Sequence, residues 1–305
     1  MTIELRLTDV DPPTAEPART IYRDIANLPD PTTLGITIRY FNYNDAGLYM
    51  QITGSATGYT FTPINLGLLA SGANIYKNLD NFASRAKPTV AQLPNGEMSE
   101  NITLTLKGYT DSGYTNLKWT FNRVVTVIWI NSTDAAFTVD ELDNFDDGTV
   151  QGWAAAAEYH VESGYPTLAV ATNYVLSTPY SLKMRQLNGA TGETRSRLYK
   201  SFTTPNKDKV YAIFDCRVTR GHYGARLKYV NFQRDSTALV FLGKPYDDVG
   251  ADNFVADKWF RIVVPLPKNT TLELRVIIDE YTDTYPYSAY WQDLYLDDFK
   301  IISKS

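Results

Sequence analysis

Strict alternation of apolar and polar side chains is the feature that most limits what this chain can fold into. It is clearest in TLELRVIID (residues 271–279) and NITLTLKGY (residues 101–109). Successive side chains of a β-strand point to opposite faces, so such segments bury one face and leave the other in water. Turn signals such as NDAG (residues 44–47) and DSG (residues 111–113) separate many of these segments. The pattern predicts an all-β protein built from antiparallel sandwiches.

Composition narrows the possible functions. The chain has 22 Tyr and 13 Phe, residue types that favour strands. Its net charge of −5 gives no basic excess, which argues against binding to nucleic acid. No apolar run approaches the roughly 18 residues of a membrane span, so membrane insertion is not expected. One cysteine and two histidines leave little material for disulfides, zinc sites or histidine-based catalysis.

A polar segment without alternation marks the domain boundary. Residues 131–143 (NSTDAAFTVDELD) interrupt two strand-rich regions. We expect an immunoglobulin-like β-sandwich at residues 34–140 and a jelly-roll sandwich at residues 143–305. Residues 1–33 hold five of the 15 prolines, so an extended arm is expected there. This arm either lies along the first domain or docks on a neighbouring subunit.

One segment has the spacing of a helix. Residues 75–86 follow Asn74, a good N-cap residue, and end two residues before Pro88. Their apolar residues recur at helical intervals: Leu79, Phe82, Ala83 and Ala86. The sequence therefore allows one helix in the first domain.

Four short motifs in the second half of the chain carry a family resemblance. They are NFDDGTVQGW (residues 144–153), STPYSLKM (residues 177–184), DKWFRIVVPLP (residues 257–267) and LYLDDFKII (residues 294–302). In this order they resemble carbohydrate-binding modules of the jelly-roll, galactose-binding-like class. The resemblance covers residues 143–305, about half the chain. It implies a jelly-roll sandwich for that half.

The same resemblance implies roles for four residues. Trp153 and Trp259 match positions at which the indole packs in the core. Asp146 and Asp297 match positions that in many relatives bind a structural calcium ion where the first and last strands meet. The first of these positions is more often Glu, which is one methylene longer than Asp. The alternative is that both aspartates are solvated strand ends without a metal.

An aromatic cluster directly precedes the last expected strand. Sugar rings stack their C–H faces on flat aromatic side chains, and exposed Tyr and Trp also anchor protein interfaces. Packing of these rings on their own sandwich is the third alternative. The predicted ligand-binding residues are Tyr281, Tyr285, Tyr287, Tyr290 and Trp291.

The sequence gives little support for catalysis. Acidic clusters such as residues 143–147 and 293–298 contain the two carboxylates that a glycosidase needs. Turns and strand ends also collect aspartate, because its side chain hydrogen-bonds to nearby backbone. His222 lies between two glycines and has no GxSxG motif to accompany it, and Cys216 lies on the apolar face of YAIFDCRV. We therefore expect a protein that is not an enzyme.

These observations lead to one functional hypothesis and two alternatives. The first is a non-enzymatic structural or attachment protein of an extracellular assembly, at a virion or cell surface. It would contact copies of itself or other structural subunits, and glycans. No secretory leader is visible in the first residues (MTIELRLTDVDPP). The alternatives are a soluble, lectin-type pair of carbohydrate-binding modules and, less favoured by the residues, a glycan-active enzyme.

Overall fold

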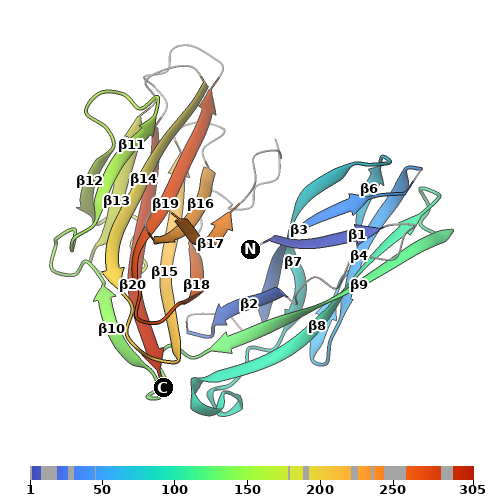
Figure 1. The fold of residues 1–305 in the computed structure, drawn as a ribbon, viewed down its shortest axis with the longest axis horizontal. Helices are drawn as coiled ribbons and strands as arrows, with labels where there is room; N and C mark the ends of the chain where they lie inside the picture. Colours follow the sequence, from blue (N-terminus) through green and yellow to red (C-terminus); the bar gives the residue numbers. More distant parts are fainter. Residues whose placement is uncertain are drawn as a thin grey trace. The chain divides into compact units, whose positions relative to one another are not determined.

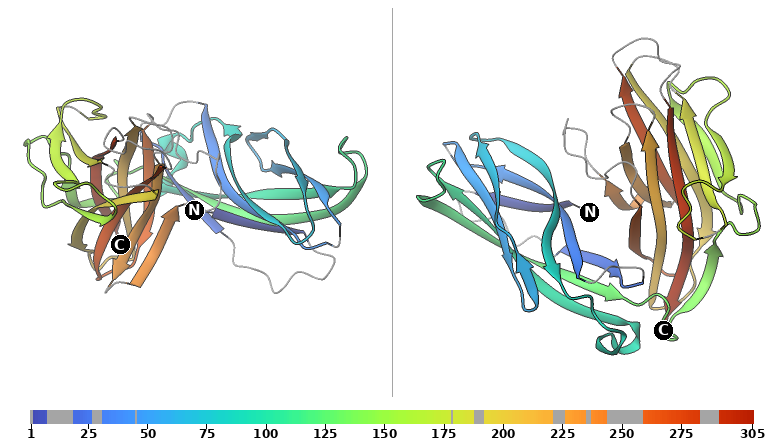
Figure 2. Two further views of the ribbon diagram at one scale, coloured as in Figure 1. Left: turned by 90° about the horizontal axis from the view of Figure 1, so that it is seen from above. Right: turned by 180° about the vertical axis from the view of Figure 1, so that it is seen from behind.

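In the computed structural model, the chain forms two compact units (Figure 1). The boundary between them lies between Asp134 and Ala135. The regular secondary structure of the described residues is almost all strand, which confirms the all-β class; two short 3-10 helices, η1 (Val90–Gln92) and η2 (Pro94–Gly96), are the exceptions. Figure 2 shows each unit from two further sides. The structure describes residues 2–7, 19–26, 31–44, 46–177, 179–187, 192–220, 226–234, 237–243, 259–282 and 291–305.

The first unit is a sandwich of two sheets. One sheet has the order β1-β3-β7-β5 and the other has the order β2-β9-β8-β4-β6. Their inner faces share one core, in which Tyr40 and Phe82 of the first sheet meet Met50 and Trp129 of the second. The strands are β1 (Thr2–Leu7), β2 (Arg19–Asp24), β3 (Thr32–Asn42), β4 (Leu48–Ser55), β5 (Tyr59–Phe61), β6 (Ile64–Leu69), β7 (Asn74–Arg85), β8 (Glu97–Tyr109) and β9 (Leu117–Ile130).

Part of the strand order of this unit matches that of an immunoglobulin-like sandwich. The A-B-E-D and C-F-G orders of that fold correspond to β1-β3-β7-β5 and β4-β8-β9. Two pairings depart from a wholly antiparallel sandwich, because β1 runs parallel to β3 and β2 runs parallel to β9. Both of these strands come from residues 1–33. Within the described residues, that segment therefore supplies strands to the first unit, where an extended arm was expected.

The helix expected at residues 75–86 is wrong, because the segment is strand β7. The register of β7 with β3 shifts between Leu34 and Ile36, so extra residues of β7 face a single residue of β3. This bulge turns both Phe82 and Ala83 into the core, together with Leu79. Inward residues at positions 79, 82 and 83 reproduce helical spacing, which explains why the sequence suggested a helix.

The second unit is an antiparallel sandwich. One sheet has the order β12-β13-β20-β15-β18 with β10 also paired to β20, and the other has the order β11-β14-β19-β16-β17. The strands are β10 (Thr138–Asp143), β11 (Ala154–Tyr159), β12 (Thr167–Ala171), β13 (Ser181–Leu187), β14 (Gly192–Thr203), β15 (Lys209–Arg220), β16 (Arg226–Arg234), β17 (Thr237–Gly243), β18 (Phe260–Leu266), β19 (Thr271–Thr282) and β20 (Trp291–Lys304).

Strand β20 is the centre of the six-stranded sheet. β15 pairs along almost its whole length on one side. On the other side, β13 pairs with residues 291–296 and β10 with residues 299–303. Asp297 and Asp298 fall in the gap between these two partners, where the register with β15 also shifts. Asp298 takes a positive φ of 50°, a conformation that Asp tolerates better than most residues.

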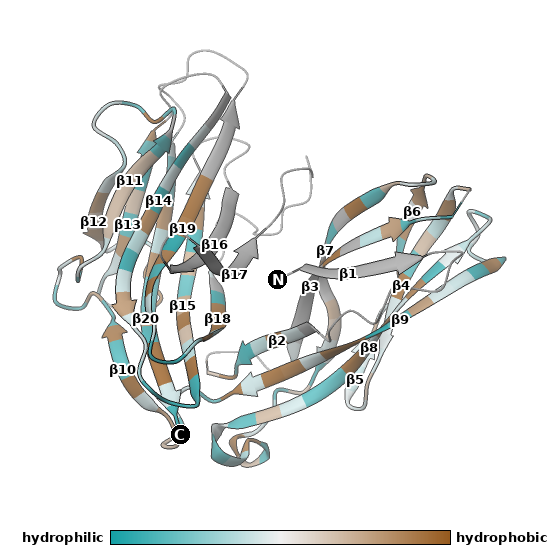
Figure 3. Ribbon diagram, in the orientation of Figure 1, coloured by the Kyte–Doolittle hydropathy of each residue, from teal (hydrophilic) through white to brown (hydrophobic). Residues whose placement is uncertain are grey.

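The core of the second unit confirms two expectations. Hydrophobic and hydrophilic residues alternate along strands of this unit such as β13 (Figure 3), as the sequence predicts. Cys216 is fully buried in the core, as expected from its apolar face. Trp153 is also buried, packs edge-to-face on Phe299, and donates from Nε1 to Oδ2 of Asp143 at 2.9 Å. Trp259 directly precedes β18 and is half-buried.

Candidate ligand-binding face of the second unit

Strand β20 divides its side chains between the two faces of the six-stranded sheet. Leu294 and Leu296 lie fully buried in the core between the sheets. Asp293 and Tyr295 alternate with them and therefore lie on the outer face, as does half-buried Trp291. We call this surface the β20 face. Its other side chains are Lys183 and Arg185 of β13, Arg217 of β15, and Asn173 and Tyr174, which precede β13.

Asp293 is a buried carboxylate that holds two cations. Arg185 lies directly opposite it in the strand pairing. The guanidinium donates from Nε to Oδ1 and from Nη2 to Oδ2, both at 2.7 Å. Nζ of Lys183 lies 3.0 Å from Oδ2. The bonds to Asp293 raise the pKa of Arg185 above its ordinary value, so Arg185 is fixed in orientation and stays charged.

Guanidinium groups lie over aromatic rings on this face. Arg185 lies 4.7 Å from the ring centre of Trp291, and Arg217 lies 4.0 Å from that of Tyr174. Tyr174 in turn packs edge-to-face on buried Tyr295. The side chain of Arg185 is 38% exposed and Tyr174 is 45% exposed. The accessible part of the β20 face thus combines flat rings with oriented cations.

Hydrogen bonds tie the segment before β13 to β20 and to the start of β13. Nδ2 of Asn173 donates to the hydroxyl of Tyr295 at 3.0 Å. The hydroxyl of Ser181 donates to the carbonyl oxygen of Tyr174 at 3.0 Å. Tyr174 has a positive φ of 57°, which its neighbours hold in place. Burial, followed by the charge of Asp293, raises the pKa of Tyr295 to about 12, so its hydroxyl stays protonated.

Asp297 anchors the same segment. Oδ2 accepts from the amides of Leu176 and Ser177 at 2.9 and 3.0 Å. Oδ1 accepts from the hydroxyl of Ser177 at 2.8 Å and from the amide of Asp298 at 2.9 Å. Burial raises the pKa of the Asp297 carboxyl above its ordinary value, against the lowering effect of these donors.

The donors around Asp297 bear directly on the predicted calcium ion. A carboxylate has about four lone-pair positions, and four donors already occupy those of Asp297. Asp146 is exposed and accepts from Nδ2 of Asn144 at 2.7 Å. Within the described ranges, no three His, Cys, Asp or Glu side chains gather as a set of metal ligands. With four donors in place, Asp297 has no lone-pair position left for a calcium ion. Calcium binding by Asp146 and Asp297 stays a prediction.

A second ion pair lies on the outer face beside Asp297. Nε of Arg261 lies 3.1 Å from both carboxylate oxygens of Asp215. Nη2 of Arg261 also lies 3.7 Å from a carboxylate oxygen of Asp298. Burial raises the pKa of the Asp215 carboxyl above its ordinary value, and the adjacent Arg261 offsets only part of this shift. Because acids outnumber the cation, this part of the sheet has no excess positive charge.

Only one predicted ligand-binding residue has a described side chain. Trp291 lies on the β20 face, under Arg185. Tyr281 is in β19, opposite Glu193 of β14. Three predicted residues lie outside the described residues: Tyr285, Tyr287 and Tyr290.

Apart from Trp291, the residues of the β20 face were not predicted as ligand-binding residues. Their signal is the alternation in WQDLYLD, which puts Trp291, Asp293 and Tyr295 on one face and Leu294 and Leu296 on the other. Lys183 and Arg185 alternate with core residues of β13 in the same way. Tyr174 has no such signal, because it lies in an irregular segment.

Cys216, His160 and His222 are the other residues that the sequence offers for reactive chemistry. Burial raises the pKa of the Cys216 thiol far above its ordinary value, which keeps it protonated and unreactive. His160 is exposed, in agreement with the expected surface position. His222 lies outside the described residues. The described part of the chain contains no helix with the length and apolar character needed to cross a membrane.

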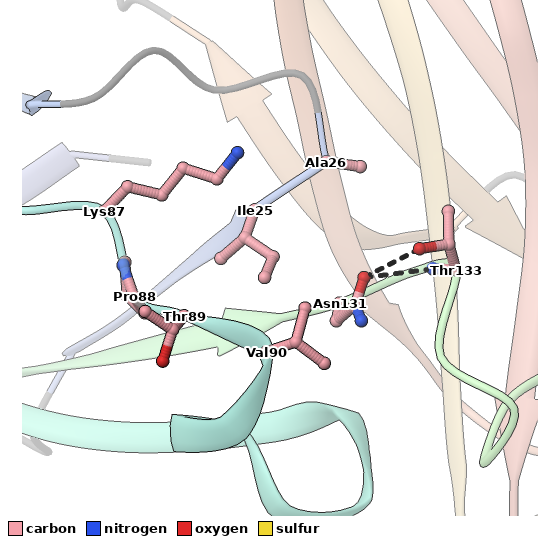
Figure 4. Close-up of a pocket in the computed structure, with 8 residues that line it drawn as sticks. All are labelled: Ile25, Ala26, Lys87, Pro88, Thr89, Val90, Asn131 and Thr133. Atoms are coloured by element: carbon pink, nitrogen blue, oxygen red, sulfur yellow. Dashed lines mark hydrogen bonds between the residues drawn. The ribbon is translucent and has the colours of Figure 1, made fainter.

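The first unit has a surface hollow of about 500 Å³, lined by residues 25–26 and 87–90 with Asn131 and Thr133 (Figure 4). Among the lining residues, Lys87 is the one ionisable side chain. The side-chain oxygen of Asn131 already accepts from the hydroxyl of Thr133 at 2.9 Å. The hollow therefore lacks the convergent polar groups of the β20 face.

Comparisons with known proteins give structural neighbours only. No family model matches the chain, and no curated protein matches it. One similar solved structure concerns the promiscuous specificity of carbohydrate-binding modules of the β-sandwich superfamily; it is 14% identical, the match covers 89% of this chain and 93% of that one, and the TM-score is 0.39. The xylan-binding domain CBM22-1 of Paenibacillus barcinonensis Xyn10C is 21% identical over 57% of this chain and 99% of its own, with a TM-score of 0.34. The mannan-recognising module TmCBM27 is 12% identical over 56% and 100%, with a TM-score of 0.36. All three are described as carbohydrate-binding modules, and the chain is assigned to no family.

Proposed function

We propose that the second unit binds carbohydrate through the β20 face, and that the protein is a non-enzymatic attachment protein. The observation that supports this most is the pairing of exposed Tyr174 and half-buried Trp291 with guanidinium groups of fixed orientation. Aromatic rings stack on the C–H faces of sugars, and oriented N–H donors bind their hydroxyl oxygens. A flat polar–aromatic surface supports binding of this kind without any catalytic group.

Among the described side chains of the β20 face, none forms an activated nucleophile or an acid–base pair, which supports a binding role. Asp293, the buried carboxylate at its centre, is occupied by two cations. A general acid or base must be able to exchange its proton with a substrate. The carboxylate of Asp293 faces Lys183 and Arg185 and is 2% exposed, so a ligand at the surface has little access to it.

A glycan array of defined oligosaccharides tests the proposal. The native protein should bind a subset of the array, and Tyr174→Ala and Trp291→Ala should each weaken that binding by about tenfold or more. Tyr43→Ala is the matched control, since Tyr43 is 50% exposed and belongs to the first unit. Loss of binding in the control, or no loss in the two variants, would contradict the assignment of the face.

Attachment to an assembly is the second part of the proposal. A virion or cell-surface location, and contacts with copies of the chain or with other subunits, would make carbohydrate binding multivalent. The mass of the purified protein in solution tests this part. An oligomer supports the attachment protein, whereas a monomer that binds glycans supports the lectin-type alternative.

A further inference from the structure

Two cations share one carboxylate on the β20 face. Lys183 and Arg185 both pair with Asp293, whose side chain is 2% exposed. Arg217 adds a third positive side chain next to Tyr174. Among the side chains that define the β20 face, these three cations therefore outnumber the one carboxylate of Asp293, although acidic residues follow on the same sheet and the whole chain has a net charge of −5. This local excess of positive charge favours a negatively charged ligand.

Arg185 has donors left for a ligand. A guanidinium group has five N–H donors. Asp293 engages the edge formed by Nε and Nη2, which leaves the edge formed by Nη1 and Nη2. The side chain is 38% exposed, and Trp291 supports its plane at 4.7 Å. The group is thus held as a preoriented two-pronged donor at the surface.

This geometry suits an anion better than a neutral hydroxyl group. Parallel N–H donors match the two oxygens of a carboxylate or sulfate, and such charge-assisted pairs are about twice as strong as neutral hydrogen bonds. A planar guanidinium binds in this way, whereas a lysine ammonium acts as a point charge. Asp293 has already fixed the rotamer of Arg185, so a ligand would lose little side-chain entropy on binding.

We propose that the β20 face selects acidic saccharides, and that Arg185 binds their carboxylate or sulfate group through its outer edge. This inference rests on the proposed carbohydrate binding and specifies its ligand class. Tyr174 and Trp291 would then contact the sugar rings, while Lys183 and Arg217 add attraction that salt screens.

An array that pairs each carboxylated or sulfated oligosaccharide with its neutral parent tests the inference. The native protein should prefer the acidic member, and about 0.5 M NaCl should weaken that preference. Arg185→Gln should lower affinity for the acidic member by about tenfold to a hundredfold more than it lowers affinity for the neutral parent. Arg185→Lys should retain the salt dependence but lose part of the affinity.

Lys268→Gln is the matched control for charge, because Lys268 is 54% exposed and lies away from the β20 face, beside Asp208. Melting temperatures of all variants separate a binding effect from a folding effect. Equal binding of acidic and neutral members, or an unchanged preference in Arg185→Gln, would overturn the inference while leaving carbohydrate binding intact. If the native protein binds no member of the array, the proposed function itself fails.

Discussion

The carboxylate of Asp297 binds both polar groups of Ser177, accepting from its amide at 3.0 Å and from its hydroxyl at 2.8 Å. These residues lie 120 positions apart in the sequence. The contact fastens the segment that includes Tyr174 to the central strand. A residue singled out as a metal ligand thus positions part of the β20 face.

Asp297→Asn should destabilise the second unit by about 1–3 kcal/mol, because an amide NH₂ group would face backbone donors that the carboxylate now accepts. Chemical denaturation of the native protein and the variant measures this difference. The same variant should weaken glycan binding, since Tyr174 would lose its anchor. Ser177→Ala is the companion variant, because it removes one of the four donors and leaves the amides in place.

Melting temperatures measured in EDTA and then with added calcium distinguish the hydrogen-bonding role of Asp297 from calcium binding. If Asp297 acts through its four donors alone, the melting temperature of the native protein stays the same in both conditions. A calcium ion at Asp146 and Asp297 would instead raise the native melting temperature by mass action and leave that of Asp297→Asn unchanged.

The second unit should gain stability from Asp297 as the pH falls. Burial raises the folded-state pKa of this carboxyl above its ordinary value of 3.8. The native state then binds the proton more readily than the unfolded state, so this contribution is fully present below pH 3.8 and is lost as the pH rises through the folded pKa. Denaturation of the native protein and Asp297→Asn at a series of pH values checks the sign. A difference between the two that is constant across the acidic range would contradict it.

Asp293→Asn should lower stability by about 1–3 kcal/mol, since it leaves Lys183 and Arg185 close together without their shared carboxylate. The partial exposure of both cations limits the cost. Lys183→Met combined with Asp293→Asn should cost less than the sum of the single changes, and a double-mutant cycle measures this coupling.

Asp24 should stabilise the first unit although it lies in the segment expected to form an arm. Its carboxylate is buried and accepts from the amide and the hydroxyl of Ser132 at 3.1 and 2.7 Å. Asp24→Ala should cost about 1–3 kcal/mol by leaving the amide of Ser132 unsatisfied. Fluorescence of buried Trp129 during denaturation reports on this unit when the other four tryptophans are replaced by Phe in both proteins. An unchanged midpoint would mean that residues 19–26 are not part of its cooperative fold.

The sequence predicted what depends on local periodicity. Strict alternation identified the strand now labelled β19, and the apolar face of Cys216 correctly indicated the core. Prediction from the sequence failed where tertiary contacts override the local pattern. A bulge in β7 imitated helical spacing, and β2 in the proline-rich segment finds its partner more than a hundred residues away in β9. Pairings of that length leave no local signal.

The candidate site was predicted in part for the same reason. Trp291 was identified from its aromatic neighbours, but Arg185 joins it only through the pairing of β13 with β20. Tyr174 becomes part of the site because hydrogen bonds hold its irregular segment in place. Asp297 was identified by its resemblance to a metal position, yet its neighbours are amides that sequence motifs do not reveal.

Strand β20 is the last strand of its unit, and β10, β13 and β15 all pair with it. On the ribosome, these three strands are made well before the strand that joins them. Their edges therefore stay open until residues 291–304 emerge, and open strand edges pair readily with other chains. A chain stopped shortly before β20 therefore retains most of the apolar surface of the unit without the strand that joins its partners.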